Sequence, residues 1–324
     1  MSLNPFRTTV IAIAVIGINA CSAHQPCPDL GIAAVDLPAI VVVPPPLPVP
    51  PRPAPVIPPP RLAIALGGGA ARGFAHVGVI KMLETQGIRP DIVVGASAGS
   101  VVGALYASGV SGFELQRMAL DKDEKSVSDW VLPNRGFIRG ESLQNFINKA
   151  VQNRTIDKLG RTLGIVATDL LSGELVVFRY GNTGLAVRAS SSVPGVFQPV
   201  MINGREYVDG GLTSPVPVRA ARDLGADIVI AVDISRDPQW AVVSDSVSVL
   251  LQTFNIMGRS LAAHELPSAD VVISPGIRKI GSTSFESRNL AILEGERAAL
   301  AAVPKIREKI AEREVRLRKA ALAN

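Results

Sequence analysis

The 324-residue sequence contains few residues that could build a metal site or a histidine-based active site, since it has two cysteines and three histidines. No group of Cys, His, Asp or Glu residues has the spacing of metal ligands, so we expect no metal and no cofactor. Aromatic residues make up only 4% and charged residues 19%, while small apolar residues are abundant. This composition suits a globular α/β protein of one or two domains with one large core.

Positive charge is concentrated near the C-terminus. The formal net charge is +5, and between Lys305 and Lys319 seven Lys and Arg residues stand against three Glu, an excess of four. The rest of the chain is therefore nearly neutral, which argues against a nucleic-acid partner bound over the domain. Residues 303–324 form the basic end of the chain, and Val303–Leu322 has a helical period. We expect this helix to pack on the domain; the alternative is that it lies on anionic headgroups.

The first twenty residues have the pattern of a bacterial export signal. Arg7 precedes the apolar stretch Val10–Ile18, which is too short to span a bilayer comfortably. The stretch runs into the sequence INAC, which resembles the lipobox of bacterial lipoproteins, although Asn19 is not the usual small or apolar residue. The resemblance implies that Cys21 is lipidated and anchors the protein to a membrane.

Two features after Cys21 refine this expectation. Ser22 is not the aspartate associated with inner-membrane retention, which favours an outer-membrane anchor facing the periplasm. Twelve of the 25 prolines lie between Pro38 and Pro60, and such a stretch favours an extended polyproline II tether over residues 21–60. The alternatives are ordinary secretion with Cys21 paired to Cys27, and a partner that docks on the PxxP pattern.

From Arg61 onward, segments typical of strands alternate with segments typical of helices. The predicted strands are Leu62–Leu66, Ile92–Val94, Gly164–Thr168, Asp227–Val232 and Val271–Ile273, with a hairpin arm at Glu174–Tyr180; the predicted helices are Phe74–Gln86, Ala98–Ser108 and Val216–Leu224. This order predicts an α/β fold with a mostly parallel central sheet flanked by helices. The polar segment Asp121–Arg139 is expected to be a flap or a surface excursion.

Three consecutive glycines, Gly67–Gly69, connect the first predicted strand to the first predicted helix. Glycines at such a junction expose backbone N–H groups that can hold negative charge. A dinucleotide fingerprint needs a glycine where Arg72 stands, and a Walker-type phosphate loop needs a lysine where Phe74 follows Gly73. Both nucleotide-binding interpretations therefore fail in detail, and a nucleotide-binding assay would test them.

The segment Gly95–Gly99, with the sequence GASAG, lies between a predicted strand and a predicted helix. This is the G-x-S-x-G pattern of a nucleophile elbow, in the context that the pattern requires. The glycines relieve crowding in a tight turn that presents Ser97 at the positive end of the following helix. Ser97 is therefore the candidate nucleophile; the alternative is a capping serine in a small-residue turn.

A serine nucleophile needs a base, and the histidines are poorly placed for that role. His24 lies in the leader region, His76 lies within a predicted helix, and His264 lies in a helical stretch without turn signals. His264 is the alternative base, whereas His76 is expected to pack or to brace a loop. Asp209 ends a short apolar run before Gly210–Gly211, so its carboxylate lies on an open turn, although D-G-G alone is only a turn signal.

The glycine loop, the serine elbow and the D-G-G turn occur in this order along the chain. Together they resemble the motifs of the patatin-like phospholipases, specifically the bacterial branch similar to the esterase domain of neuropathy target esterase. The resemblance covers residues 61–302 and includes the stretches ATDLLSGE, SSVPGVFQPV and AVDIS. It implies a three-layer α/β/α fold and a Ser97–Asp209 dyad that works without histidine. It also implies that the loop around Gly68 and Gly69, with neighbouring Gly67 and Ala70, forms an oxyanion hole.

The implied activity is hydrolysis of lipid carboxylic esters, as in a phospholipase A or lysophospholipase. Arg72 would support the oxyanion site, steer a lipid phosphate or brace the loop. Asp169 and Asp233 follow predicted strands and are expected to cap or turn the chain. The alternative function is that of a catalytically silent envelope lipoprotein that binds acyl chains or a partner; protein partners are not predicted.

Overall fold

The computed structural model describes residues 57–120, 140–241, 243–281 and 284–323, all within the unit Ala54–Asn324. The predicted signal peptide and lipidation site, most of the predicted tether and the segment Asp121–Arg139 lie outside the described residues.

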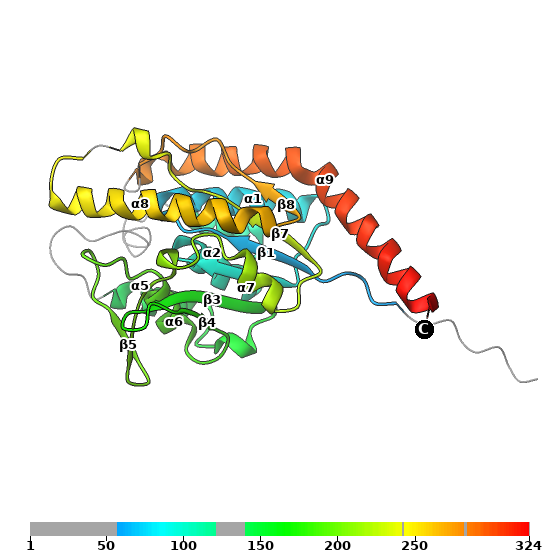
Figure 1. Ribbon diagram of the computed structural model, residues 1–324, viewed down its shortest axis with the longest axis horizontal. Coiled ribbons are helices and arrows are strands. Elements are labelled where there is room, and N and C mark those ends of the chain that lie inside the picture. Colours follow the sequence, from blue (N-terminus) through cyan, green and yellow to red (C-terminus); the bar gives the residue numbers. More distant parts are fainter. Residues whose placement is uncertain (1–56, 121–139, 242, 282–283, 324) are drawn as a thin grey trace, which may run out of the picture. The chain divides into compact units, whose positions relative to one another are not determined.

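The described residues contain one eight-stranded sheet (Figure 1). Its strands are β1 (Leu62–Leu66), β2 (Ile92–Ala96), β3 (Thr162–Asp169), β4 (Leu175–Phe178), β5 (Val200–Ile202), β6 (Arg205–Asp209), β7 (Ile228–Val232) and β8 (Val271–Ile273). The order is β5-β6-β3-β2-β1-β7-β8, with β4 also paired to β3. Strands β3, β2, β1, β7 and β8 are parallel neighbours, while β4, β5 and β6 pair antiparallel. The predicted mostly parallel sheet is therefore confirmed.

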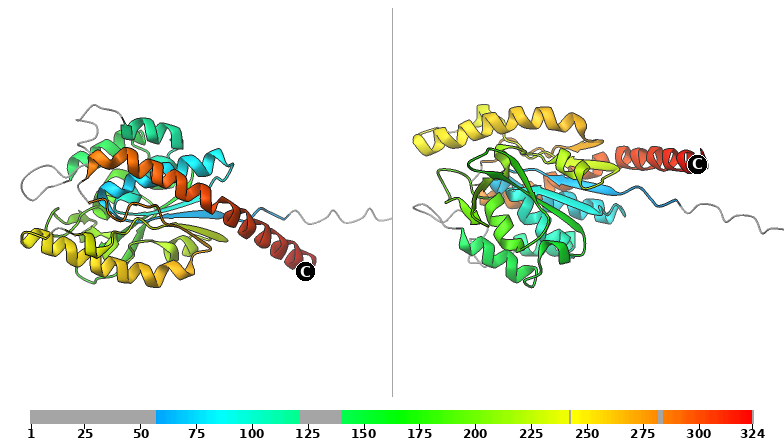
Figure 2. Two further views of the ribbon diagram at one scale, coloured as in Figure 1. Left: turned by 90° about the horizontal axis from the view of Figure 1, so that it is seen from above. Right: turned by 60° about the horizontal axis from the view of Figure 1, so that its bottom comes forward.

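Helices cover both faces of this sheet, as a buried parallel sheet requires (Figure 2). They are α1 (Phe74–Thr85), α2 (Ala98–Ala107), α3 (Gly112–Leu120), α5 (Glu141–Ala150), α6 (Thr183–Ser190), α7 (Val218–Asp223), α8 (Ser246–Glu265) and α9 (Arg288–Ala323). Short 3-10 helices are η1 (Ala70–Gly73), η2 (Ile156–Lys158), η3 (Gly210–Leu212), η4 (Pro238–Trp240), η5 (Leu266–Ser268) and η6 (Phe285–Ser287).

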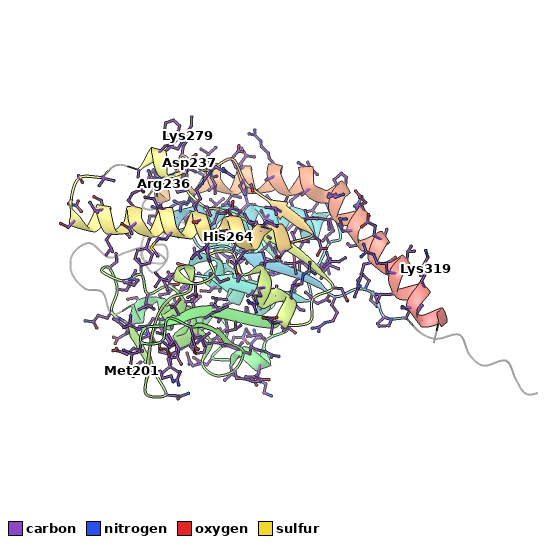
Figure 3. All side chains as sticks on the ribbon, viewed as in Figure 1. Met201, Arg236, Asp237, His264, Lys279 and Lys319 are labelled. Atoms are coloured by element: carbon purple, nitrogen blue, oxygen red, sulfur yellow. The ribbon has the colours of Figure 1, made fainter. Side chains whose placement is uncertain are left out.

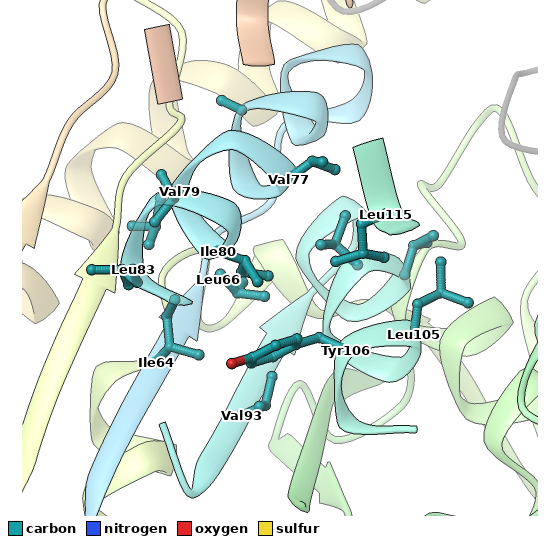
Figure 4. Packing of buried hydrophobic residues seen from close by; sticks show 14 of the residues in the cluster. Ile64, Leu66, Val77, Val79, Ile80, Leu83, Val93, Leu105, Tyr106 and Leu115 are labelled. Carbon is teal, nitrogen blue, oxygen red and sulfur yellow. The ribbon is translucent and has the colours of Figure 1, made fainter. Parts of the chain in front are cut away.

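Successive residues of β1 point to opposite faces and so enter two different hydrophobic clusters. Ile64 and Leu66 pack with apolar residues of α1 and α2 (Figure 4). Buried residues of α9 belong to the same cluster. Ala63 and Ala65 pack with α7 and with Ala262 of α8. Small side chains on the second face allow the short helix α7 to approach the sheet closely. The sheet is thus the middle of three layers, as predicted.

Helix α9 packs directly on α1. A Cβ atom on Gly78 of α1 would lie 1.9 Å from the carbonyl oxygen of Ile292, and one on Gly295 of α9 would lie 2.1 Å from that of Ala75. Both positions therefore require glycine, and the two helix backbones touch. Farther along α9, Arg313 forms an ion pair of 2.6 Å with Asp227.

The predicted C-terminal helix starts too late. The helical period predicts a start at Val303, but α9 begins at Arg288 and continues through Pro304. The predicted domain boundary between residues 302 and 303 therefore falls inside one helix. Pro304 cannot donate to the carbonyl of Leu300, and both residues lie on the exposed side of the helix. Val303 and Ile306 are buried, which agrees with a helix packed on the domain.

Candidate active site

Ser97 is the single residue between β2 and α2, and its backbone has φ 51° and ψ −122°. A positive φ is uncommon for serine and marks a strained turn. The turn is held by two other serines: the Ser97 N–H donates to Oγ of Ser190 (2.9 Å), and the Ser97 carbonyl accepts from Oγ of Ser100 (2.7 Å). Ser97 itself is half-buried at the N-terminus of α2. The structure thus has the predicted strand–turn–helix elbow.

The flanking glycines of the elbow are required by close backbone packing. A Cβ atom on Gly95 would lie 2.3 Å from the carbonyl oxygen of Gly99, and one on Gly99 would lie 2.1 Å from that of Leu66. Neither position has room for a side chain. The start of α2 therefore sits directly on the end of β1, which fixes the position of Ser97 above the sheet.

Asp209 is the last residue of β6, and its backbone is held at both ends. Its N–H donates to the carbonyl of Ser192 (3.0 Å), and its carbonyl accepts from Oγ1 of Thr168 on β3 (3.0 Å). The carboxylate oxygen Oδ1 accepts from the N–H of Gly211 (2.7 Å). One carboxylate oxygen is thus fixed by the D-G-G turn.

The structure brings Ser97 and Asp209 together. Asp209 is only 5% exposed, and burial raises the pKa of its carboxyl group to about 6, while the Ser97 hydroxyl and the Gly211 N–H oppose that rise. Although the two side chains interact, Oδ2 of Asp209 has no partner at hydrogen-bond distance among the described residues. The two side chains therefore lie near each other while Oδ2 of Asp209 makes no hydrogen bond. Hydrogen bonds of this kind are often long in the absence of substrate and shorten when it binds.

The glycine loop passes beside Ser97, since a Cβ atom on Gly68 would lie 3.3 Å from the Ser97 Cβ. Two of the four predicted oxyanion donors are already occupied in this conformation: the Gly67 N–H donates to Val232 (3.1 Å) and the Gly68 N–H donates to Pro215 (2.9 Å).

The other two predicted donors differ from these. In the part of the chain that the structure describes, no backbone acceptor is found for the N–H of Gly69 or Ala70. Ala70 has φ 50°, which is a strained conformation for a residue with a side chain. Of the four predicted donors, the N–H groups of Gly67 and Gly68 thus have backbone acceptors, whereas those of Gly69 and Ala70 have none among the described residues.

Two buried side chains brace this loop. Nε2 of His76 lies 2.8 Å from the carbonyl oxygen of Gly67, and burial lowers the pKa of His76 to about 4, so the ring is neutral and donates from Nε2. Arg72 is 2% exposed and donates to the carbonyls of Ile234 (2.8 Å) and Ile280 (3.3 Å). Burial also lowers the pKa of Arg72, to about 10. Of the three roles considered for Arg72, these contacts support bracing.

The remaining sequence candidates lie apart from this chemistry. His264 is exposed on α8 (Figure 3), and the group that interacts with Ser97 is Asp209. Oδ1 of Asp169 accepts from the backbone N–H groups two and three residues ahead, and Oδ1 of Asp233 accepts from the N–H two residues ahead. Both carboxylates thus cap turns, as expected.

Sequence reasoning missed two supporting residues, Ser190 at the end of α6 and Thr168 on β3. Thr168 lies within the stretch ATDLLSGE, which carried the family resemblance, but nothing in that stretch indicates contact with Asp209. The described residues contain no group of three or more His, Cys, Asp or Glu side chains that could hold a metal ion.

Comparison with known proteins finds a family model that matches the part of the chain holding this site. Residues 64–222, which include the glycine loop, Ser97 and Asp209, match the family model described as patatin-like phospholipase. An uncharacterized NTE family protein of Mycobacterium tuberculosis is 34% identical over 207 residues, which is 63% of this chain and 57% of that protein. The mouse patatin-like phospholipase domain-containing protein 6 is 35% identical over 197 residues, 58% of this chain and 14% of that protein.

The chain thus spans less than two thirds of the length of these sequence relatives. Among solved structures, VipD from Legionella pneumophila is similar with a TM-score of 0.48 and 15% identity, covering 79% of this chain and 67% of that one. The matched residues 64–222 make up just under half of this chain and hold all three motifs, the glycine loop, the serine elbow and the D-G-G turn. Over that segment, the chain is similar to the patatin-like phospholipases.

Proposed function

We propose that the protein is a serine acyl hydrolase that cleaves carboxylic esters of lipids, as a phospholipase A or a lysophospholipase. The observation that carries this proposal is the interaction of Ser97, on its strained elbow, with the buried carboxyl group of Asp209. The similarity of residues 64–222 to the patatin-like phospholipase model supports lipid esters as the substrate class.

In the proposed reaction, Asp209 takes the proton of the Ser97 hydroxyl as Oγ attacks the ester carbonyl. The tetrahedral intermediate collapses, its C–O bond to the leaving alcohol breaks, and Asp209 returns the proton to that alcohol. Water then attacks the acyl-enzyme by the same route, which releases the fatty acid and regenerates Ser97. An aspartate with a pKa of about 6 is a stronger base than a solvated one, which favours the first step.

The negative charge that develops on the carbonyl oxygen would be received by the N–H groups of Gly69 and Ala70. Losing one such donor typically costs about 2.7–4 kcal/mol of transition-state stabilisation. Because His76 and Arg72 hold the loop in place, the donors need little reorganisation as the charge forms.

The decisive experiment combines active-site labelling with lipid analysis. Wild-type protein should react with a fluorophosphonate probe on Ser97 and should release free fatty acid from mixed envelope lipids, as measured by mass spectrometry. The Ser97→Ala variant should do neither while keeping its circular dichroism spectrum. Wild-type protein that is inert toward both the probe and the lipids would instead favour the catalytically silent lipoprotein.

We further propose that Cys21 carries a lipid anchor and that residues 21–60 tether the hydrolase domain, residues 61–302, to the outer membrane on its periplasmic side. The support is the export signal, the lipobox-like sequence and the Pro-rich stretch. The intact mass of protein extracted from membranes tests this. An acylated N-terminus at Cys21 is expected, whereas an unmodified chain with a Cys21–Cys27 disulfide would show ordinary secretion.

A further inference from the structure

Helix α8, η4 and the segment between them expose a series of large apolar side chains. Six of them are between 37% and 53% exposed: Trp240, Val243, Val249, Leu250, Ile256 and Met257. On α8 they recur at positions i, i+1, i+7 and i+8, so they share one face of the helix. A surface helix of a globular domain normally turns polar side chains outward. The outward face of α8 instead carries these four large apolar side chains together with the uncharged Thr253 and Ser260.

The composition of α8 sharpens the contrast. From Ser246 to Ala263 the helix has one charged residue, Arg259. The sides of α8 that turn toward the domain are apolar as well, with Leu251 and Phe254 half-buried and Ala262 buried. An outward face without charged side chains that exposes four large apolar ones is unusual for a helix in contact with water. The exposed face of α8 therefore indicates a surface that a partner covers.

The structure favours a helix that lies along a membrane surface over one that crosses the membrane. In the described parts of the chain, no helix has the length and hydropathy needed to cross a bilayer. Nε2 of Gln252 on α8 donates to the carbonyl of Pro238 (2.9 Å), which fastens η4 and its Trp240 to the helix. An apolar face with an adjoining tryptophan is typical of helices that bury partway into a bilayer interface.

Cations gather at the η4 end of this face (Figure 3). Nζ of Lys279 lies 4.8 Å from the centroid of the Trp240 ring, and Arg278 beside it is also exposed. Arg236 donates to the Trp240 carbonyl. Two carboxylates lie in this group: Asp237 accepts from the N–H and Nε2 of Gln239, and Asp233 forms an ion pair of 4.0 Å with Arg278. Because the Asp233 side chain is only 9% exposed, the charge that faces solvent here is mainly that of Arg278 and Lys279, which complements anionic headgroups.

The same helix packs on both loops that shape the active site. A Cβ atom on Gly195 would lie 2.4 Å from Leu250 of α8, and Gly195 belongs to the segment in which Ser192 holds the Asp209 N–H. A Cβ atom on Gly258 of α8 would touch Pro215 at 3.9 Å, and Pro215 accepts the Gly68 N–H. A bilayer lying against α8 would thus be adjacent to the elements that carry the dyad and the glycine loop.

We propose that α8 and η4 form a docking surface for a bilayer containing anionic phospholipids, which brings lipid substrate to the Ser97–Asp209 pair. This inference rests on the proposed acyl hydrolase function for its purpose, and on the apolar face and its cations for its location. It implies that the enzyme acts on aggregated lipid in preference to dissolved esters.

The test uses the full chain carrying Cys21→Ser throughout, so that no lipid anchor contributes to binding. Three quantities are measured: co-flotation with vesicles of phosphatidylglycerol and phosphatidylcholine, fatty acid release from those vesicles, and turnover of a soluble p-nitrophenyl butyrate. The double variant Ile256→Ser/Met257→Ser removes the centre of the apolar face. The matched control is Leu290→Ser/Leu300→Ser on α9, where both side chains are 51% exposed.

The α8 variant should lose about tenfold or more in vesicle binding and in vesicle hydrolysis, because two side chains no longer enter the bilayer, while p-nitrophenyl butyrate turnover stays unchanged. The α9 control should bind as the parent does. Lys279→Glu should weaken binding to vesicles with phosphatidylglycerol but not to vesicles of phosphatidylcholine alone.

Equal vesicle binding by the α8 variant and the α9 control would overturn the docking surface. Sedimentation velocity that shows a dimer of the parent, dispersed by the α8 variant, would also overturn it, because a second copy would then cover the face. If the soluble ester is not hydrolysed but vesicle binding depends on α8, the proposed function fails and the docking surface stands. If the soluble ester is hydrolysed but vesicle binding does not depend on α8, the proposed function stands and the docking surface fails.

Discussion

The backbone N–H of Gly68 donates a hydrogen bond of 2.9 Å to the carbonyl oxygen of Pro215. Pro215 belongs to the loop that follows Asp209, so this bond joins the glycine loop directly to the loop of the proposed base. The neighbouring bond from Gly67 to Val232 fixes the same loop to the end of β7. The glycine loop and the loop that follows Asp209 are therefore positioned by each other and by the sheet.

The pH dependence of ester hydrolysis should follow the ionisation of Asp209. Because the base must be unprotonated and burial raises its pKa to about 6, kcat/KM for a soluble ester should increase through about pH 6 and then level off. Asp209→Asn should lower kcat by about two to four orders of magnitude and remove this rise. Stopped-assay rates across the range would check both, and a near-normal rate in the variant would return His264 to consideration.

The free energy of unfolding should depend on the same carboxyl group, but it should fall with rising pH where the rate increases. Since the pKa of Asp209 is raised from 3.8 to about 6 on folding, the folded state binds its proton more tightly than the unfolded state. Stability from this group is greatest at low pH and is lost as the pH rises through that window, by about 3 kcal/mol in total. Asp209→Asn should therefore raise the free energy of unfolding at about pH 8, but not below about pH 4. Urea denaturation at both pH values measures this.

Replacement of His264 by Gln should leave ester turnover within about twofold of wild type, because an exposed surface substitution of this kind rarely matters. His76→Gln is the contrasting variant, since it disturbs the buried contact with the Gly67 carbonyl. It should lower the free energy of unfolding by about 1–3 kcal/mol. A large loss of turnover in the His264 variant alone would contradict the Ser97–Asp209 dyad.

Two glycine substitutions in α2 should differ in their effect on stability, because only one of them lies in the serine elbow. In Gly99→Ala the new methyl group would meet the Leu66 carbonyl at 2.1 Å, and the free energy of unfolding should fall by about 3 kcal/mol or more. The matched control is Gly103→Ala on the same helix, where the nearest atom is a Val93 methyl group at 3.1 Å. That variant should change stability by about 1 kcal/mol or less, because side chains can shift and alanine favours the helix. Thermal and urea unfolding would compare the two.

The sequence alone predicts those parts of the site that depend on local pattern. The elbow at Ser97 could be placed because the strand, the two glycines and the helix are contiguous. The pairing of Ser97 with Asp209 came from family resemblance, since no local pattern brings such distant residues together. The occupied N–H groups of Gly67 and Gly68 could not be predicted, because their acceptors, Val232 and Pro215, approach only through the folded sheet.

Helix α6 was not predicted because its sequence is not typical of a helix and its position depends on contacts in the folded protein. Helix α6 includes Gly184, which lowers its helix propensity, yet a Cβ atom there would lie 2.2 Å from the carbonyl oxygen of Gln144 on α5. Glycine at this position serves contact between two helices rather than a turn. Because Ser190 lies at the end of α6, the hydrogen bond that holds the Ser97 backbone was missed with the helix.

The close approach of α1 and α9 at Gly78 and Gly295 also orders the biogenesis of the protein. The ribosome makes α1 soon after β1, but the segment that covers it comes only after all the strands have been made. The main core includes α9 residues from Ala291 to Ile306, so a nascent chain lacks part of that core until synthesis has passed residue 306. For the export proposed above, such a delay would keep the incomplete polypeptide loosely folded, as threading through a translocation channel requires.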